Sequence, residues 1–204
     1  AGGGTVCAVK VLKNQGDYVR ADSPQRKEFE AEAQLMIRLP RHDNVVRLLG
    51  ICVQPLALVV EFVAGGSLDK LLRDAAQALT VGELLSFCAD ITGGLAALHA
   101  AGIIHRDLAT RNVLLTAERR CLLTDFGLSR ATAAGADQEA ANYTQQAVGP
   151  LKWMAPEAIE KKKYSVRTDV YSLAITFAEI FKRSDPYPDQ APVVIASQVL
   201  LQGM

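Results

Sequence analysis

The segment from His105 to Asn112, HRDLATRN, concentrates side chains that could carry out catalysis. Asp107 is an acid, Arg111 is a cation four positions later, and Asn112 is an amide next to it. A carboxylate can accept a proton from a hydroxyl group, and an amide oxygen is a suitable ligand for a hard divalent cation. This combination, at this spacing, fits phosphoryl transfer onto a hydroxyl group.

Three further motifs accompany this segment. Ala8-Val9-Lys10 precedes it, and Asp125-Phe126-Gly127 and Ala155-Pro156-Glu157 follow it. The four occur in the order of the protein-kinase signature set, and several motifs in one order are far more specific than one octapeptide. From about residue 5 to its end, the chain therefore resembles a eukaryotic protein kinase domain, closest to the tyrosine-kinase and tyrosine-kinase-like groups.

The resemblance implies an α+β, two-lobed protein kinase fold. A single domain over 1–204 would comprise part of a small, β-rich N-lobe (1–64) and part of a mainly helical C-lobe (65–204). Short apolar runs predict strands at 5–12, 45–53, 56–63, 113–115 and 121–124. Apolar residues at helical spacing predict helices at 25–39, 67–73, 80–102 and 168–181. Aperiodic stretches at 14–24 and 131–148 are expected to be loops.

Lys10 lies in an otherwise apolar strand and, by the resemblance, holds the α- and β-phosphates of ATP. An unpaired strand lysine could equally extend its amine to water. Its expected partner is Glu32, although Glu28 and Glu30 are chemically possible. Glu32 is favoured because it lies one turn before Met36, on the apolar face of the predicted helix.

The resemblance also implies ATP and Mg²⁺ as cofactors. Asn112 and Asp125 would supply oxygen ligands for Mg²⁺; each alone could instead be a turn residue. By the resemblance, Val60 is the gatekeeper, and Ala8 and Leu114 would sandwich the adenine. Glu61 and Val63 would offer backbone hydrogen bonds to the base. Phe126 would belong to a regulatory stack with His105, Met36 and Leu48.

By the resemblance, Asp107 would accept the proton of the attacking hydroxyl, or orient it. The class of the acceptor residue depends on three other positions. Ala109 stands where serine/threonine kinases usually carry lysine, and the cation is Arg111 instead. Pro150 stands where a threonine is common. Tyrosine is therefore the favoured acceptor on a protein substrate, although serine/threonine or dual-specificity enzymes of the tyrosine-kinase-like group have similar loops.

Tyr143 lies between the DFG and APE motifs, where an activating phosphosite is expected. A phosphate there could pair with Arg106. Thr132 and Thr144 compete with Tyr143 for this role, and an ordinary exposed loop tyrosine is the simpler alternative.

One family motif is absent, since no GxGxxG precedes Lys10 and Gly2-Gly3-Gly4 lies too close to replace it. Both ends look cut, so the chain is expected to be a fragment without the glycine-rich loop and the last helices, and it could be inactive alone. This departure keeps open a second function class, a pseudokinase that binds or scaffolds without catalysis. Retention of Lys10, Asp107 and Asp125 weighs against it.

Composition narrows the partners and the compartment. The 22 basic and 22 acidic side chains give a formal net charge of zero, which does not favour nucleic acid. No uninterrupted apolar run approaches the ~20 residues of a membrane helix, so membrane attachment is expected only through other regions, if any. Four dispersed cysteines suggest buried free thiols in a reducing, cytoplasmic compartment. The sequence is also compatible with a parent protein that is a membrane receptor and carries this domain on its cytosolic side.

Overall fold

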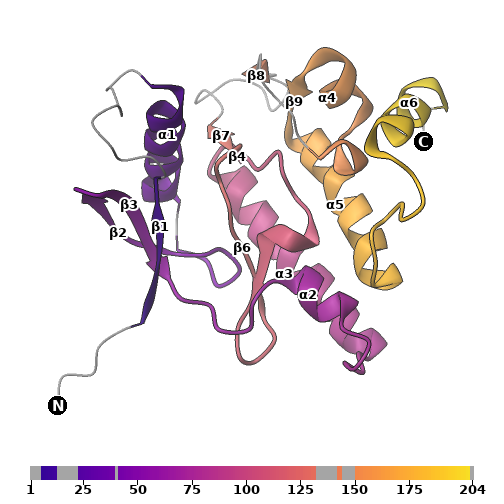
Figure 1. Ribbon diagram of the computed structural model, residues 1–204, viewed down its shortest axis with the longest axis horizontal. Coiled ribbons are helices and arrows are strands. Elements are labelled where there is room, and N and C mark those ends of the chain that lie inside the picture. The colour runs from indigo at the N-terminus through magenta and orange to yellow at the C-terminus, as the bar shows by residue number, and fades with distance from the viewer. Residues whose placement is uncertain (1–5, 13–22, 40, 132–141, 144–149, 203–204) are drawn as a thin grey trace.

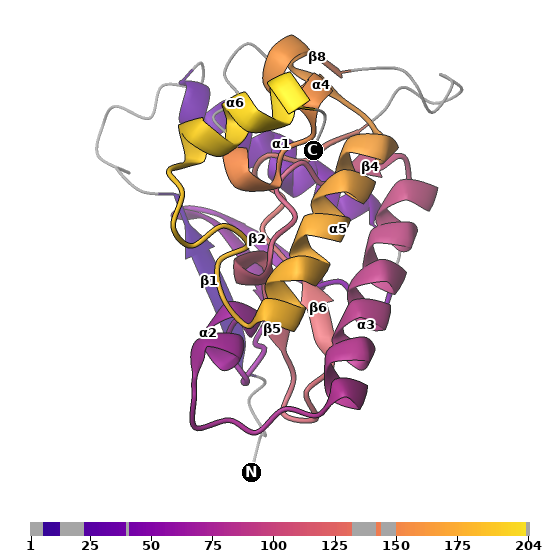
Figure 2. The same cartoon turned by 90° about the vertical axis from the view of Figure 1, so that its right-hand side faces the viewer.

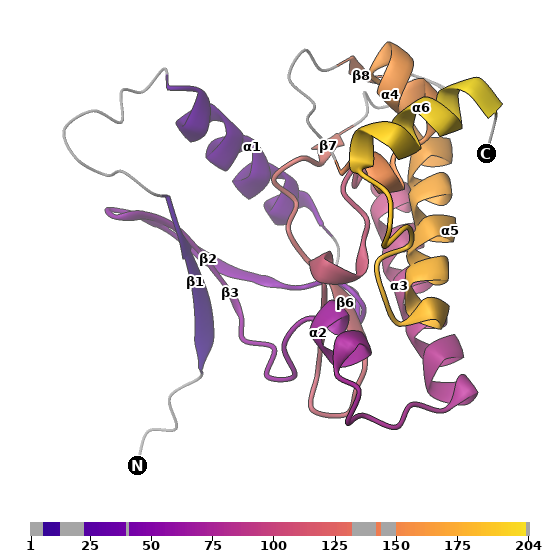
Figure 3. The ribbon, with the colours of Figure 1, turned by 45° about the vertical axis from the view of Figure 1, so that its right-hand side comes forward.

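A small antiparallel sheet with one helix beside it forms the first part of the chain (Figure 1). The computed structural model describes residues 6–12, 23–39, 41–131, 142–143 and 150–202. The sheet has the order β1-β3-β2, and its strands are β1 (Cys7–Val11), β2 (Leu48–Val53) and β3 (Leu56–Glu61). The register pairs Ala8 with Val60 and Lys10 with Leu58. Helix α1 (Pro24–Arg38) stands beside this sheet (Figure 3).

Helix α1 carries clear start signals. Ser23 is its N-cap and accepts a hydrogen bond from the backbone N–H of Arg26, and Pro24 occupies the first turn, where its missing N–H costs nothing. One face is buried, and Glu32 lies on that face together with apolar residues such as Phe29 and Met36. The helix therefore points a carboxylate inward, toward the sheet.

The described residues that follow the sheet are mainly helical, with three short strand pairs. The helices are α2 (Leu68–Arg73), α3 (Val81–Ala100), α4 (Pro156–Lys161), α5 (Val166–Lys182) and α6 (Pro192–Gln202). The pairs are β4 (Ile103–Ile104) with β7 (Arg130–Ala131), β5 (Val113–Leu115) with β6 (Cys121–Leu123), and β8 (Asn142–Tyr143) with β9 (Lys163–Tyr164). Two 3-10 turns are η1 (Thr110–Asn112) and η2 (Leu151–Trp153). Helices α3 and α5 lie side by side (Figure 2). The predicted α+β fold is confirmed.

Helix α3 is the central core helix of this part. Thr80 and Glu83 form a capping box at its start, and Gly102, at φ 71°, follows the C-cap. Contrary to the sequence estimate, its 20 residues are apolar enough, by length and composition alone, to cross a membrane. Its apolar stripe is instead packed in the core with residues from the sheet and from α5, among them Leu58 and Ile180. We therefore read α3 as a buried helix of the domain.

Backbone hydrogen bonds of the glycine pair Gly65-Gly66 hold the two parts of the chain together. The N–H of Gly65 donates to the carbonyl of Leu115 at 2.8 Å, and the N–H of Leu115 donates back to Gly66 at 2.9 Å. A Cβ on Gly65 would lie 2.5 Å from the Leu115 carbonyl oxygen, so only glycine allows this approach. The backbone of Leu123 also pairs with Asn44 and Val46. These bonds fix the β5–β6 hairpin against the segment that enters β2.

Some boundaries differ from the sequence predictions. The strand expected at 45–53 begins only at Leu48, because the backbone of Val46 is used in pairing with Leu123 instead. Ser67 is the N-cap of α2 but makes no side-chain cap bond. The loop expected at 131–148 contains described residues of β7 and β8, both held by strands distant in sequence. Pro24, expected at the end of a loop, is instead the first residue of α1. Residues 14–22 of that loop and most of the other loop lie outside the described residues.

The cysteines are all free thiols, but not all are buried. Cys88 and Cys121 are buried, and burial raises the pKa of both, so they remain protonated. Cys7 is exposed, because it lies at the start of the edge strand β1, and Cys52 is half-buried. The prediction of buried thiols is therefore right for two of the four.

Candidate active site

Lys10 and Glu32 form the predicted ion pair between β1 and α1. The Lys10 amine lies 2.7 Å from Oε1 and 3.0 Å from Oε2 of Glu32. Glu32 is 6% exposed, whereas the rival Glu30 pairs with Arg26 at 2.7 Å on the helix surface. Burial lowers the pKa of Lys10, but the hydrogen bonds and charges of Glu32 and Asp125 outweigh it and leave the pKa raised. Lys10 is therefore held as a cation, and the register predicted for α1 is confirmed.

Asp125 extends this pair toward the catalytic segment. Its Oδ1 accepts a hydrogen bond from the Lys10 amine at 3.2 Å and a longer one from the Gly127 N–H at 3.4 Å. Its backbone has φ 61°, which is uncommon for a residue with a side chain and points to a functional constraint. About half of the side chain is exposed. A carboxylate fixed by a lysine yet open to solvent can still bind a cation.

Asp107 is held from two sides within its own loop. Arg111 donates a hydrogen bond to Oδ1 of Asp107. The Nδ2 amide of Asn112 donates to Oδ2 at 2.9 Å and to the Asp107 carbonyl at 2.7 Å. Because the nitrogen of the Asn112 amide is committed to Asp107, its oxygen is the atom left to bind a cation. The loop thus orients the three residues singled out by the sequence.

Asp169, at the start of α5, anchors this loop from below. It accepts hydrogen bonds from the backbone N–H of His105 at 2.8 Å and of Arg106 at 2.9 Å, and it contacts the His99 ring at 2.8 Å. Asp169 is 1% exposed, so these bonds are shielded from water. Asp169 therefore has a structural role, which is to hold the backbone of the catalytic loop.

Asp169→Ala is expected to lower the free energy of unfolding by roughly 2–5 kcal/mol, because two buried N–H groups lose their acceptor. Asp189→Ala is the control, since Asp189 is exposed and accepts no described hydrogen bond; a change within about 0.5 kcal/mol is expected there. Chemical denaturation of the full-length protein measures both. Equal stability of the two variants would mean that Asp169 does not anchor the loop.

His105 and Phe126 pack as a ring pair beneath the site. Their centroids lie 5.7 Å apart with a 59° interplanar angle, and both side chains are essentially buried. Phe126 and Met36 belong to the same core cluster, with Leu48 packed against it. The position of Asp125 is therefore coupled to α1 through the residue that follows it in the chain.

Trp153 and Glu179 are site residues that sequence reasoning missed. Glu179, 2% exposed on α5, accepts bonds from the Thr110 N–H at 3.2 Å, the Thr110 hydroxyl and the Trp153 indole at 3.0 Å. The guanidinium of Arg111 lies 5.0 Å from the Trp153 ring centroid. Glu179 thus joins the catalytic loop to the segment after Pro150. A glutamate within an otherwise largely apolar helix was the available signal for Glu179.

The residues expected around adenine come from both parts of the chain. Ala8 and Val60 are neighbours across β1 and β3. Leu114 forms a bridge with Ser67, just after the link that contains Val63. The Glu61 N–H already donates to the Arg47 carbonyl at 3.0 Å. Any bond from Glu61 to a base must therefore use its carbonyl oxygen.

Arg106 and Tyr143 are connected through β9. Arg106, at φ 68° and buried, lies with its guanidinium 4.7 Å from the centroid of the Tyr164 ring. Burial, and then the charge of Arg130, lower the pKa of Arg106 to about 10, so it stays cationic at neutral pH. The backbone of β8 pairs Asn142 with Tyr164 and Tyr143 with Lys163. The Tyr143 side chain lies outside the described residues, as do Thr132 and Thr144.

Comparison with known proteins agrees with this geometry. The profile of the family described as "Protein tyrosine and serine/threonine kinase" matches residues 2–203. Serine/threonine-protein kinase STY46 of Arabidopsis thaliana is 36% identical over 98% of this chain, and tyrosine-protein kinase ZAP-70 of Mus musculus is 40% identical over 85%. Inactive tyrosine-protein kinase kin-32 of Caenorhabditis elegans is 34% identical over 85%. The matched regions span 34%, 27% and 19% of those three proteins.

Proposed function

Since the chain belongs to the protein tyrosine and serine/threonine kinase family, we propose that it transfers the γ-phosphoryl group of ATP to a protein hydroxyl, with tyrosine favoured. One observation carries the proposal: the Lys10 amine bridges Glu32 and Asp125, while Arg111 and Asn112 orient Asp107. Phosphate binding, metal binding and proton acceptance are thereby each provided by a fixed side chain.

The donor set fits Mg²⁺ and ATP. When bound, these supply the transferable phosphoryl group and neutralise its charge. The Asp125 carboxylate and the Asn112 amide oxygen would hold the metal, and Lys10 would hold the α- and β-phosphates. Ala8, Val60 and Leu114 would enclose the base. The Glu61 carbonyl would accept a hydrogen bond from the base, and the backbone of Val63 would make a further one.

Asp107 would act on the acceptor. Its carboxylate, with 16% of the side chain exposed, can accept the hydroxyl proton or orient the hydroxyl for attack. Arg111 and Asn112 restrict the rotation of the Asp107 carboxylate. Arg111 also adds positive charge where the negative charge of the reacting groups must be stabilised. The ring pair of His105 and Phe126 keeps the segment carrying Asp125 in place.

Tyrosine is the favoured acceptor because of Ala109, Arg111 and Pro150. The guanidinium of Arg111 lies over the ring of Trp153, three residues after Pro150. This contact supports the proposal, because it holds the Arg111 cation between the catalytic loop and the segment that would bind the phenol of the substrate. A serine/threonine or dual-specificity enzyme is the second candidate, because the relative STY46 is a serine/threonine-protein kinase. A pseudokinase is the third, favoured by similarity to the inactive kin-32 and opposed by the retained Lys10, Asp107 and Asp125.

We further propose that the chain is one kinase domain, with lobes at 1–64 and 65–204. Its partners would be ATP and a protein substrate, and it would act on the cytosolic side, where ATP is available. Nucleic acid is not an expected partner, and any membrane attachment would come through other regions.

Phosphorylation of Tyr143 is expected to activate the enzyme. A phosphotyrosine carries about −1.5 to −2 charge and would pair with the cationic Arg106. The pairing of β8 with β9, next to Tyr164, supports this choice. The full-length protein incubated with Mg-ATP should show phosphate on Tyr143 by mass spectrometry, and a peptide panel should show tyrosine acceptors. Phosphate only on serine and threonine would overturn the acceptor assignment, and full activity of Tyr143→Phe would remove the switch.

A further inference from the structure

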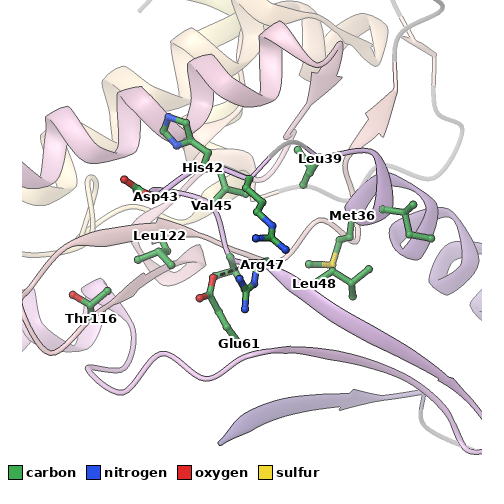
Figure 4. A pocket seen from close by; sticks show the side chains of 13 residues that line it. Met36, Leu39, His42, Asp43, Val45, Arg47, Leu48, Glu61, Thr116 and Leu122 are labelled. Carbon is green, nitrogen blue, oxygen red and sulfur yellow. Dashed lines mark hydrogen bonds between the residues drawn. The ribbon is translucent and has the colours of Figure 1, made fainter. Parts of the chain in front are cut away.

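A cavity of about 460 Å³ lies beside the end of β3, and Glu61, a proposed backbone partner of the base, is part of its lining. It is enclosed by the end of α1, the segment entering β2, the end of β3 and the β5–β6 hairpin (Figure 4). Met36, Leu48 and Leu122 give it apolar walls, and Arg41 and Arg47 add two guanidinium groups. Lys10, Asp107 and Asp125 do not line it.

Arg41 and Arg47 contrast with Arg119 and Arg120. Within the described part of the chain, neither guanidinium makes a hydrogen bond or an ion pair, whereas Arg119 and Arg120 pair with Glu83 and Asp90 at 2.6 and 2.7 Å. Both Arg41 and Arg47 are exposed to solvent. Two unpaired guanidinium groups at one cavity are a favourable arrangement for a divalent anion, because each can donate two parallel hydrogen bonds.

Two acids, Glu61 and Asp43, line the same cavity. Oε1 of Glu61 accepts the backbone N–H of Arg47 at 2.7 Å. Asp43 acts on Arg120, whose pKa is raised mainly by its hydrogen bond to Asp90 and to a smaller degree by the Asp43 charge. His42 accepts the Asn44 N–H at Nδ1 at 3.1 Å, which leaves Nε2 as a donor. The guanidinium groups of Arg41 and Arg47 and the Nε2 atom of His42 are the donors that a ligand in the cavity could use.

We propose that this cavity binds a phosphotyrosine side chain of a peptide segment. The phosphate would accept hydrogen bonds from the guanidinium groups of Arg41 and Arg47. The aromatic ring would lie against the apolar wall that includes Met36 and Leu122. A phosphoserine offers the same anion without a ring, and an unmodified tyrosine offers the ring without the anion. Recruitment of phosphorylated proteins to the enzyme would follow, whichever hydroxyl the enzyme itself phosphorylates.

Fluorescence polarisation on the full-length protein without ATP tests the proposal. The probe is a labelled phosphotyrosine peptide with small flanking residues, compared with its phosphoserine and unmodified counterparts. Both counterparts are expected to bind about tenfold or more weakly. The double variant Arg41→Ala/Arg47→Ala is expected to lose about tenfold or more in affinity for the phosphotyrosine peptide. Equal binding of the three peptides would overturn the proposal.

Arg38→Ala is the matched control, because Arg38 is an exposed arginine near the end of α1 that does not line the cavity. Its affinity should equal that of the wild type, and an equal loss would show a nonspecific charge effect instead of a site. The double variant Arg41→Lys/Arg47→Lys keeps the charge and removes the paired donors, so it should also bind more weakly. Wild-type affinity in both double variants would overturn the proposal. Activity on an unrelated peptide, measured in the same preparations, should not change in any variant.

Discussion

Asp107→Asn is expected to slow phosphoryl transfer by about 10²–10⁴ while leaving the affinity for Mg-ATP within about twofold. The amide cannot accept the hydroxyl proton, but it keeps the size of the carboxylate. Arg111 and Asn112 both donate hydrogen bonds to the Asp107 carboxylate, so asparagine would also be oriented less well. The loss should therefore appear in kcat and not in nucleotide binding.

Steady-state kinetics with a tyrosine peptide and nucleotide titration measure these two effects separately. Asp125→Asn is the contrasting variant, because Asp125 touches Lys10 and not Asp107. It should weaken the use of Mg-ATP as well as turnover. Near-normal turnover in Asp107→Asn would exclude the assigned base, and identical profiles of the two variants would mean that their roles are not distinct.

Glu32→Gln is expected to lower kcat/KM by about 10²-fold. Removal of its charge frees the Lys10 amine from a bidentate contact, and displacement of a positioning group by about 1 Å can cost this much in rate. The remaining contact of Lys10 with Asp125 would then pull the amine toward the proposed metal ligand. Kinetics as a function of ATP concentration should show the effect in KM for ATP and in kcat together.

Glu30→Gln provides a control on the same helix. It makes the same chemical change two residues away, where the carboxylate pairs with Arg26 on the helix surface. Exposed pairs of this kind contribute little, so activity within about twofold of the wild type is expected. An equal loss in both variants would show that helix stability, and not the Lys10 contact, limits activity.

Local chemistry made much of the fold and site predictable. Thr80 with Glu83 is a start signal that acts within a few residues, and α3 begins there. Ser23 with Pro24 is a signal of the same kind for α1, although Pro24 was expected to belong to the preceding loop. Glu32 could be chosen over its neighbours because helical periodicity alone places it on the buried face.

Features that depend on distant chain segments were not predictable in the same way. Glu179 receives bonds from Thr110 and Trp153, which lie 69 and 26 residues away along the chain. The strands β7 and β8 each have two residues, and they exist because β4 and β9 supply partners from elsewhere. No periodicity can appear in so short a segment, so such pairing becomes visible only in the folded chain.

Transfer of labelled phosphate from [γ-³²P]ATP tests the central claim most directly. The full-length protein, with Mg²⁺ and a mixture of peptides that carry tyrosine, serine or threonine, should label a peptide hydroxyl, preferentially tyrosine. The Asp107→Asn protein, prepared in the same way, should incorporate at least about 10²-fold less label. Binding of Mg-ATP without any labelled product from the wild type would contradict the account and identify the chain as a pseudokinase. Equal labelling by both proteins would contradict the assignment of Asp107.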